Sequence, residues 1–156
     1  IGSANNPHHF LSVTKFGHSA IIKTKGNKDC HIILRGGAGQ PNYESEFVND
    51  ASSKLAAAGV VDKVMVDFSH ANSAKQYKRQ LDVCADVATQ ISSGNDALFA
   101  VMVESHLVEG QQKVVAGEPL TYGQSITDAC IGWDDTETVM AELAEAVLAR
   151  RALTAK

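Results

Sequence analysis

Reactive side chains follow apolar runs at nearly equal intervals along this chain. Arg35 and His70 are 35 residues apart, His70 and Glu104 are 34 apart, and each stands at or just beyond the end of an apolar stretch. An interval of this size is about the length of one strand–helix unit. The spacing therefore predicts an α/β fold in which parallel strands alternate with helices.

Five runs have the composition of β-strands. They span residues 9–15, 20–24, 30–34, 63–68 and 97–103. The first runs are too close together for an intervening helix, which predicts a β-hairpin. The run 63–68 is almost wholly apolar, as expected for a strand that is covered on both faces.

Apolar residues recur with helical spacing between and after the later strands. The pattern predicts helices over 44–58, from Asn72 or Ser73 to Gly94, and from Asp134 or Asp135 onward. The segment 106–125 contains three glycines and a proline and has no helical pattern. A connection of that length inside a compact domain is usually functional.

Four side chains are candidates for a site at the strand ends: Arg35, His70, Glu104 and Asp128. The carboxyl ends of parallel strands meet at one rim, where ligands bind. A histidine and two carboxylates that converge there suit a divalent metal ion. An arginine followed by the open backbone amides of two glycines suits a phosphate.

Each candidate also has an ordinary interpretation without a ligand. A histidine at a strand end is often only hydrogen-bonded, and an arginine is often a plain surface residue. A carboxylate after an apolar strand can turn to solvent, because burying it unpaired is costly. An aspartate near the start of a helix is commonly a cap.

Composition excludes several classes of protein. The hydrophobic content of 44% and charged content of 21% indicate a folded globular chain. The net charge of −4 and the lack of a basic stripe argue against nucleic acid as a partner. No apolar run is long enough to cross a membrane. Three cysteines without close pairs fit a reducing compartment, so we expect a cytoplasmic protein.

The beginning of the chain has neither an initiator Met nor the pattern of a signal peptide. A predicted strand also follows almost at once. We therefore expect the sequence to be a C-terminal piece of a longer polypeptide.

Six strings are specific enough to compare with known families. They are HFLSVTK at 9–15, DCHIILRGG at 29–37, PNY at 41–43, DFSHANS at 67–73, VMVESHLVEG at 101–110 and SITDACIGW at 125–133. Together they resemble class I 3-deoxy-D-arabino-heptulosonate 7-phosphate (DAHP) synthase. The resemblance covers essentially all 156 residues but only the C-terminal half of that family's chain.

The resemblance implies an α/β fold that is the C-terminal half of a (β/α)8 TIM barrel with an inserted β-hairpin. Residues 1–156 would then be the C-terminal part of a single catalytic domain whose N-terminal half is absent. The implied activity is that of a transferase in the shikimate pathway of aromatic amino acid biosynthesis. Phosphoenolpyruvate and erythrose 4-phosphate condense with water to DAHP and phosphate.

The resemblance also implies roles for the candidate residues. His70, Glu104 and Asp128 match three of the family's four metal ligands, and Arg35 matches an arginine that binds the phosphate of phosphoenolpyruvate. Arg35 and His70 are thus the expected catalytic residues. The ion would be Mn²⁺ or Fe²⁺, although this kind of ligand set tolerates other first-row metals.

Other parts of the family's site have no match here. The fourth metal ligand is a cysteine upstream of this sequence, as is a Lys-Pro-Arg-Thr motif for the sugar phosphate. The unmatched cysteines of this chain are Cys30, Cys84 and Cys130. The alternative to an enzyme is therefore a non-catalytic barrel fragment that is inactive alone and binds ligand weakly or pairs with another half.

The hairpin segment resembles the phenylalanine-sensitive type within the family. Phe10, Ser12 and Ile22 match residues that line the effector pocket of that type. The resemblance therefore implies feedback inhibition by phenylalanine and a dimeric or tetrameric assembly. Without the resemblance, the same residues would be the core of an ordinary hairpin.

Overall fold

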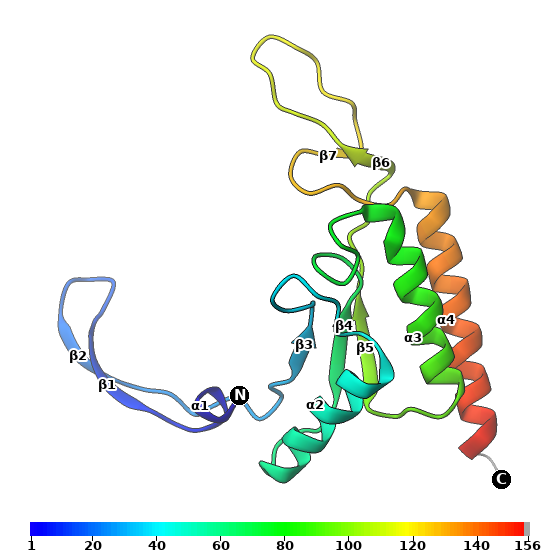
Figure 1. Cartoon of the computed structure of the whole chain (residues 1–156). Coiled ribbons are helices and arrows are strands. Elements are labelled where there is room, and N and C mark those ends of the chain that lie inside the picture. Colours follow the sequence, from blue (N-terminus) through cyan, green and yellow to red (C-terminus); the bar gives the residue numbers. More distant parts are fainter. Residues whose placement is uncertain (155–156) are drawn as a thin grey trace.

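The structure, a computed structural model, describes residues 1–154 (Figure 1). The strands are β1 (His9–Val13), β2 (Ser19–Lys23), β3 (Ile32–Leu34), β4 (Val64–Asp67), β5 (Leu98–Met102), β6 (Val108–Gln111) and β7 (Gln124–Ser125). The helices are α1 (Gly2–Asn5), α2 (Ser45–Ala57), the 3₁₀ turn η1 (Tyr77–Arg79), α3 (Gln80–Ser92) and α4 (Trp133–Thr154). The mixed α/β fold that the sequence predicts is confirmed.

The centre of the fold is a three-stranded parallel sheet in the order β3-β4-β5. Beyond β5 the sheet continues for one step, because Ser105 forms a parallel bridge with Ile131. The amide of His106 donates to the carbonyl of Ile131 at 3.0 Å, and the amide of Ile131 donates to the carbonyl of Glu104 at 3.0 Å. The ends of β3, β4 and β5 and the segment before α4 therefore meet at one rim.

The helices cover one face of this sheet. Val64 and Val66 of β4 and Leu98 of β5 are buried in one cluster with side chains of α2, α3 and α4. Helices α3 and α4 run side by side (Figure 1). The opposite face is open, since Ile33 is 39% exposed and Phe99 is 49% exposed. Every residue of the run 63–68 is itself buried or half-buried, so the expectation of cover on both faces is met more closely for this central strand than for its neighbours β3 and β5.

The predicted hairpin is confirmed as the antiparallel pair β1–β2, in which Phe10 faces Ile22 and Ser12 faces Ala20. It extends away from the parallel sheet (Figure 1). Its side chains are largely exposed, with Leu11 at 81%. Among residues 1–154, no helix combines the length and the apolar character that crossing a membrane requires.

Two predicted helix starts are wrong. Helix α3 begins at Gln80, not at Asn72 or Ser73, because the intervening residues form turns and η1. The Asn72 side chain is buried and donates to the carbonyls of Leu34 at 3.1 Å and Asp67 at 2.7 Å, so it joins two strand ends. Helix α4 begins at Trp133, which places both Asp134 and Asp135 in its first turn.

The segment expected to be a long loop contains two short strands. Strands β6 and β7 pair in parallel, and Gly110 also forms an antiparallel bridge with Cys130. Between β6 and β7 the chain forms a long loop that extends away from the sheet (Figure 1). The strands and the bridge tie the base of this loop to the segment that carries Asp128.

Candidate active site

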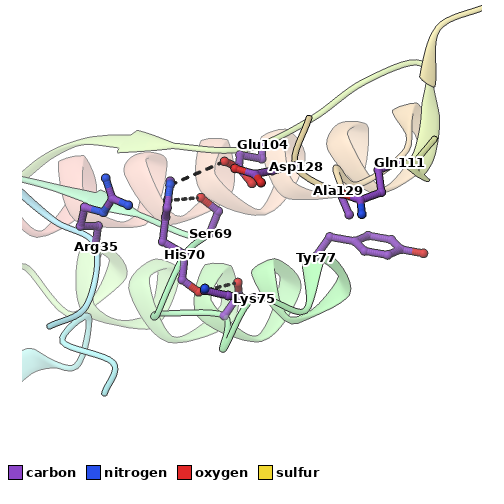
Figure 2. Close-up of a pocket in the computed structure, with 10 residues that line it drawn as sticks. Arg35, Ser69, His70, Lys75, Tyr77, Glu104, Gln111, Asp128 and Ala129 are labelled. Atoms are coloured by element: carbon purple, nitrogen blue, oxygen red, sulfur yellow. Dashed lines mark hydrogen bonds and ion pairs between the residues drawn. The ribbon is translucent and has the colours of Figure 1, made fainter. Parts of the chain in front are cut away.

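A cavity of about 470 Å³ lies at the rim where β3, β4 and β5 end (Figure 2). All four candidate side chains line it. The full lining is Arg35, Ser69, His70, Ser73, Lys75, Tyr77, Glu104, Gln111, Asp128 and Ala129. The structure therefore brings together the residues that the sequence predicts to converge.

His70 follows β4 after two residues and has a left-handed backbone with φ of 56°. For a residue with a Cβ atom this conformation is strained, by roughly 1–3 kcal/mol, and it persists where neighbouring contacts fix it. The carbonyl of His70 accepts the amide of Lys75 at 2.8 Å, and the amide of Ala71 donates to the carbonyl of Arg35 at 3.2 Å. These bonds hold the histidine at the cavity wall.

The orientation of the His70 ring follows from its partners. Nδ1 lies 2.9 Å from Oδ2 of Asp67 and 2.7 Å from Oγ of Ser69. The Ser69 hydroxyl donates to Oδ1 of Asp67 at 2.6 Å, so it can only accept from the ring. Nδ1 therefore donates to these two oxygens, and Nε2 is the ring nitrogen that faces Glu104. A carboxylate behind the distal ring nitrogen is the usual setting of a metal-binding histidine.

Glu104 stands two residues beyond β5, with Oε1 3.9 Å from Nε2 of His70. Desolvation raises the pKa of its carboxyl group, the nearby His70 lowers it, and the charges of Asp128 and Asp67 raise it again. Negative charge is thus concentrated at a partly dehydrated position. Such a position favours a cation, which would offset the repulsion between the carboxylates.

Asp128 comes from the segment after β7 and completes a set of three donors. One ligand atom from each of His70, Glu104 and Asp128 lies within 4.8 Å of the other two (Figure 2). Donor atoms that share one ion at about 2.1 Å are roughly 3–4 Å apart, so the set needs a small inward closure. Imidazole and carboxylate donors in this arrangement fit a divalent first-row metal ion.

The environment of Arg35 differs in one respect from the prediction. The amide of Gly36 donates to Oδ1 of Asn42 at 2.7 Å, and the amide of Gly37 donates to the carbonyl of Gln40 at 2.9 Å. Neither amide is open to a ligand, so the prediction of an amide-lined phosphate site is wrong. A second cation, Lys75, lines the same cavity as Arg35. The two side chains together suit an anionic ligand.

Three residues of this site lacked a role in the sequence interpretation: Asp67, Ser69 and Lys75. Asp67 is 2% exposed, and its carboxylate orients the histidine three residues later. The sequence could indicate Asp67 only through a general rule: a metal-binding histidine normally has a carboxylate partner. Lys75 has a left-handed backbone with φ of 60°, which no local sequence pattern predicts.

The remaining candidates lie elsewhere. Phe10, Ser12 and Ile22 are on the hairpin, with Phe10 opposite Ile22 and half exposed. The three cysteines are free thiols, and Cys84 is fully buried in the core. Burial raises the pKa of the Cys130 thiol, which disfavours the thiolate form that acts as a nucleophile or metal ligand.

Comparisons with known proteins identify the family of this chain. The family described as the DAHP synthetase I family matches residues 1–141. The chain is 62% identical over 154 residues to a phospho-2-dehydro-3-deoxyheptonate aldolase of Haemophilus influenzae, covering 99% of this chain and 42% of that protein. It is 61% identical over 151 residues to the Phe-sensitive enzyme of that name from Escherichia coli K12, covering 97% and 43%.

A solved structure of the phospho-2-dehydro-3-deoxyheptonate aldolase from Francisella tularensis SCHU S4 superimposes with a TM-score of 0.86 at 51% sequence identity. The superposition covers 95% of this chain and 43% of that chain. The chain thus spans less than half the length of the relatives it matches. The chain belongs to the DAHP synthetase I family.

Proposed function

We propose that these residues are part of a DAHP synthase, which condenses phosphoenolpyruvate with erythrose 4-phosphate and water to DAHP and phosphate. The proposal is carried by one observation: His70, Glu104 and Asp128 converge within 4.8 Å in a cavity that Arg35 also lines. The names of the relatives from Haemophilus and Escherichia support the same reaction. The reaction is the first step of the shikimate pathway.

The proposed chemistry assigns a task to each side chain. A divalent ion, Mn²⁺ or Fe²⁺, held by His70, Glu104 and Asp128 would polarise the aldehyde of erythrose 4-phosphate. Arg35 donates charge-assisted hydrogen bonds to the phosphate of phosphoenolpyruvate, and Lys75 adds a positive charge in the same cavity. A carbon–carbon bond then forms between the enol carbon and the aldehyde carbon. Water adds to the neighbouring carbon of phosphoenolpyruvate, which carries the phosphate group, and phosphate then departs from that carbon.

We place residues 1–156 in one TIM-barrel domain and the missing part of the site in a further stretch of the polypeptide. The parallel order β3-β4-β5, with helices on one face only, is what part of a barrel would show. A cysteine of that further stretch would be the fourth metal ligand. The free cysteines of this chain agree with a cytoplasmic location.

We also propose phenylalanine as a feedback inhibitor and a dimer or tetramer as the working assembly. The Phe-sensitive relative from Escherichia is 61% identical, and Phe10, Ser12 and Ile22 share one face of the hairpin. Replacing Ser12 with Leu should relieve inhibition by phenylalanine while turnover stays intact. Inhibition curves of a full-length protein that contains these residues test this, and an unchanged curve would count against the pocket.

The test of the reaction is phosphate release from the two substrates with Mn²⁺, in a full-length protein that contains these residues. His70→Ala should abolish turnover and most of the Mn²⁺ affinity, because it removes a ligand that the other donors cannot replace. The control is His18→Ala, which changes an exposed histidine in the hairpin turn. Wild-type turnover of His70→Ala after chelation and restoration of Mn²⁺ would refute the assignment.

A further inference from the structure

Gln80, the first residue of α3, is an amide side chain with 0% exposure. Burial of an amide is costly unless both of its polar atoms are hydrogen-bonded. In Gln80 both atoms bond to a single residue. Its Oε1 accepts the backbone amide of Glu104 at 2.9 Å, and its Nε2 donates to the backbone carbonyl of Glu104 at 3.0 Å.

The direction of both bonds is fixed by chemistry. A backbone amide only donates and a carbonyl only accepts, so the reversed orientation of the Gln80 amide would lose both bonds. The side chain thus pairs with Glu104 as a neighbouring strand would. Strand β5 ends at Met102, and the pairing with Gln80 occurs two residues later at Glu104.

The carbonyl of Glu104 also accepts the amide of Ile131 at 3.0 Å. Ile131 is three residues beyond Asp128 and is fully buried. The peptide units of Glu104 are therefore fixed from α3 on one side and from the Asp128 segment on the other. The hydrogen bond between Ile131 and Glu104 thus links the backbone of one proposed metal ligand, Glu104, to the segment that carries another, Asp128.

We infer that Gln80 is a positioning residue that sets the place of the Glu104 carboxylate relative to His70 and Asp128. The inference rests on the proposed function of that site. Gln80 does not line the cavity, and both of its hydrogen bonds go to the backbone of Glu104 rather than to the carboxylate, so it acts through that backbone. Groups that orient a ligand in this way commonly change metal affinity by about tenfold to a hundredfold when removed.

Gln90 offers a matched control on the same helix. Its side chain is also buried, at 8% exposure, and its Nε2 donates to the carbonyl of Tyr43 at 2.8 Å. Tyr43 does not line the cavity. Replacing either glutamine with Met keeps a similar volume and removes buried hydrogen bonds, so both changes lower stability. Only the change at Gln80 releases a proposed ligand.

The experiment is a Mn²⁺ titration followed by electron paramagnetic resonance on the unsubstituted protein, Gln80→Met, Gln90→Met and His70→Ala. We expect Gln80→Met to raise the Kd for Mn²⁺ by about tenfold or more, and Gln90→Met to leave it unchanged. Amide hydrogen exchange should also accelerate at Glu104 in Gln80→Met alone. If Gln80→Met does not fold, Gln80→Asn, which retracts the amide by one methylene, should give the same two effects.

Different failures have different meanings. An unchanged Kd in folded Gln80→Met or Gln80→Asn, or an equal loss in Gln90→Met, would overturn the role of Gln80 alone. If the unsubstituted protein and His70→Ala bind Mn²⁺ equally, the metal site itself is wrong, and the inference is overturned with it.

Discussion

At the residue scale, Gly36 determines how closely the loop that carries Arg35 approaches the loop that carries His70. A Cβ atom on Gly36 would lie 2.5 Å from Cβ of Ala71 and 2.8 Å from the carbonyl oxygen of Gln40. Its φ of 83° is also in the left-handed region. The contacts are with backbone and a short side chain, which cannot move aside without displacing the rim of the cavity.

Gly36→Ala should therefore destabilise the protein by about 1–3 kcal/mol through clash and backbone strain. Gly37→Ala is the control, because a Cβ atom there meets nothing within 4 Å and needs no left-handed backbone. Urea denaturation of both variants measures the difference. Equal stability of the two would show that the close approach at Gly36 is not needed.

A functional residue could be predicted from the sequence where its side-chain chemistry and its position after a predicted strand indicated the same role. His70 and Glu104 were predictable, because polar groups just after apolar strands meet at one rim. Asp128 follows no apolar strand, and its place beside them depends on the segment after β7. The roles of Asp67 and Gln80 were not predictable in this way. Their contacts depend on a left-handed turn and on a helix start that local patterns do not specify.

At the element scale, the strands of the parallel sheet were predictable, but two of the helix starts and the short strands β6 and β7 were not. β4 and β5 are apolar runs bounded by polar residues, so their positions follow from composition. Asn72 has the chemistry of an N-cap, but its side chain bonds to two strand ends instead. Cap chemistry and turn chemistry use the same residue types, and only the folded chain distinguishes them.

Three elements meet at Lys78 of η1. Its ammonium group pairs with Glu109 of β6 and, at 2.6 Å, with Asp135 in the first turn of α4. These two pairings raise the pKa of the lysine. Glu109 precedes Gly110, whose bridge to Cys130 lies two residues from Asp128. The two ion pairs thus connect β6 to η1 and α4. Strand β6 is in turn bridged to the segment that carries Asp128.

Lys78→Met should loosen β6, and amide hydrogen exchange should accelerate at Gly110 and Cys130, whose amides bond to each other's carbonyls. High salt weakens these ion pairs in the wild-type protein too. The difference in exchange rate between the wild type and Lys78→Met should therefore shrink as the salt concentration rises. Lys54→Met is the control, since it removes an exposed pair with Asp50 on α2. Unchanged exchange at both amides in Lys78→Met would contradict this role of the lysine.

At the scale of the whole molecule, one face of the parallel sheet has no cover within residues 1–154. Phe99 is 49% exposed there, and its ring makes an edge-to-face contact with the ring of His31 at a centroid distance of 5.0 Å. Parallel sheets occur almost only with both faces covered. The apolar character of the strands, which indicated two covered faces, is therefore explained if further polypeptide packs on this face.

The open face gives a test that separates the chain alone from a longer protein that contains it. Phe99→Ser should cost less than about 1 kcal/mol in the chain alone, where the ring is half exposed. In the longer protein the same change should cost about 3 kcal/mol, because the ring would be buried. Val66→Ala is the control: Val66 is fully buried against the helices, so its loss should cost about 2 kcal/mol in both. Equal costs for Phe99→Ser in both forms, measured by urea denaturation, would show that nothing further covers this face of the sheet.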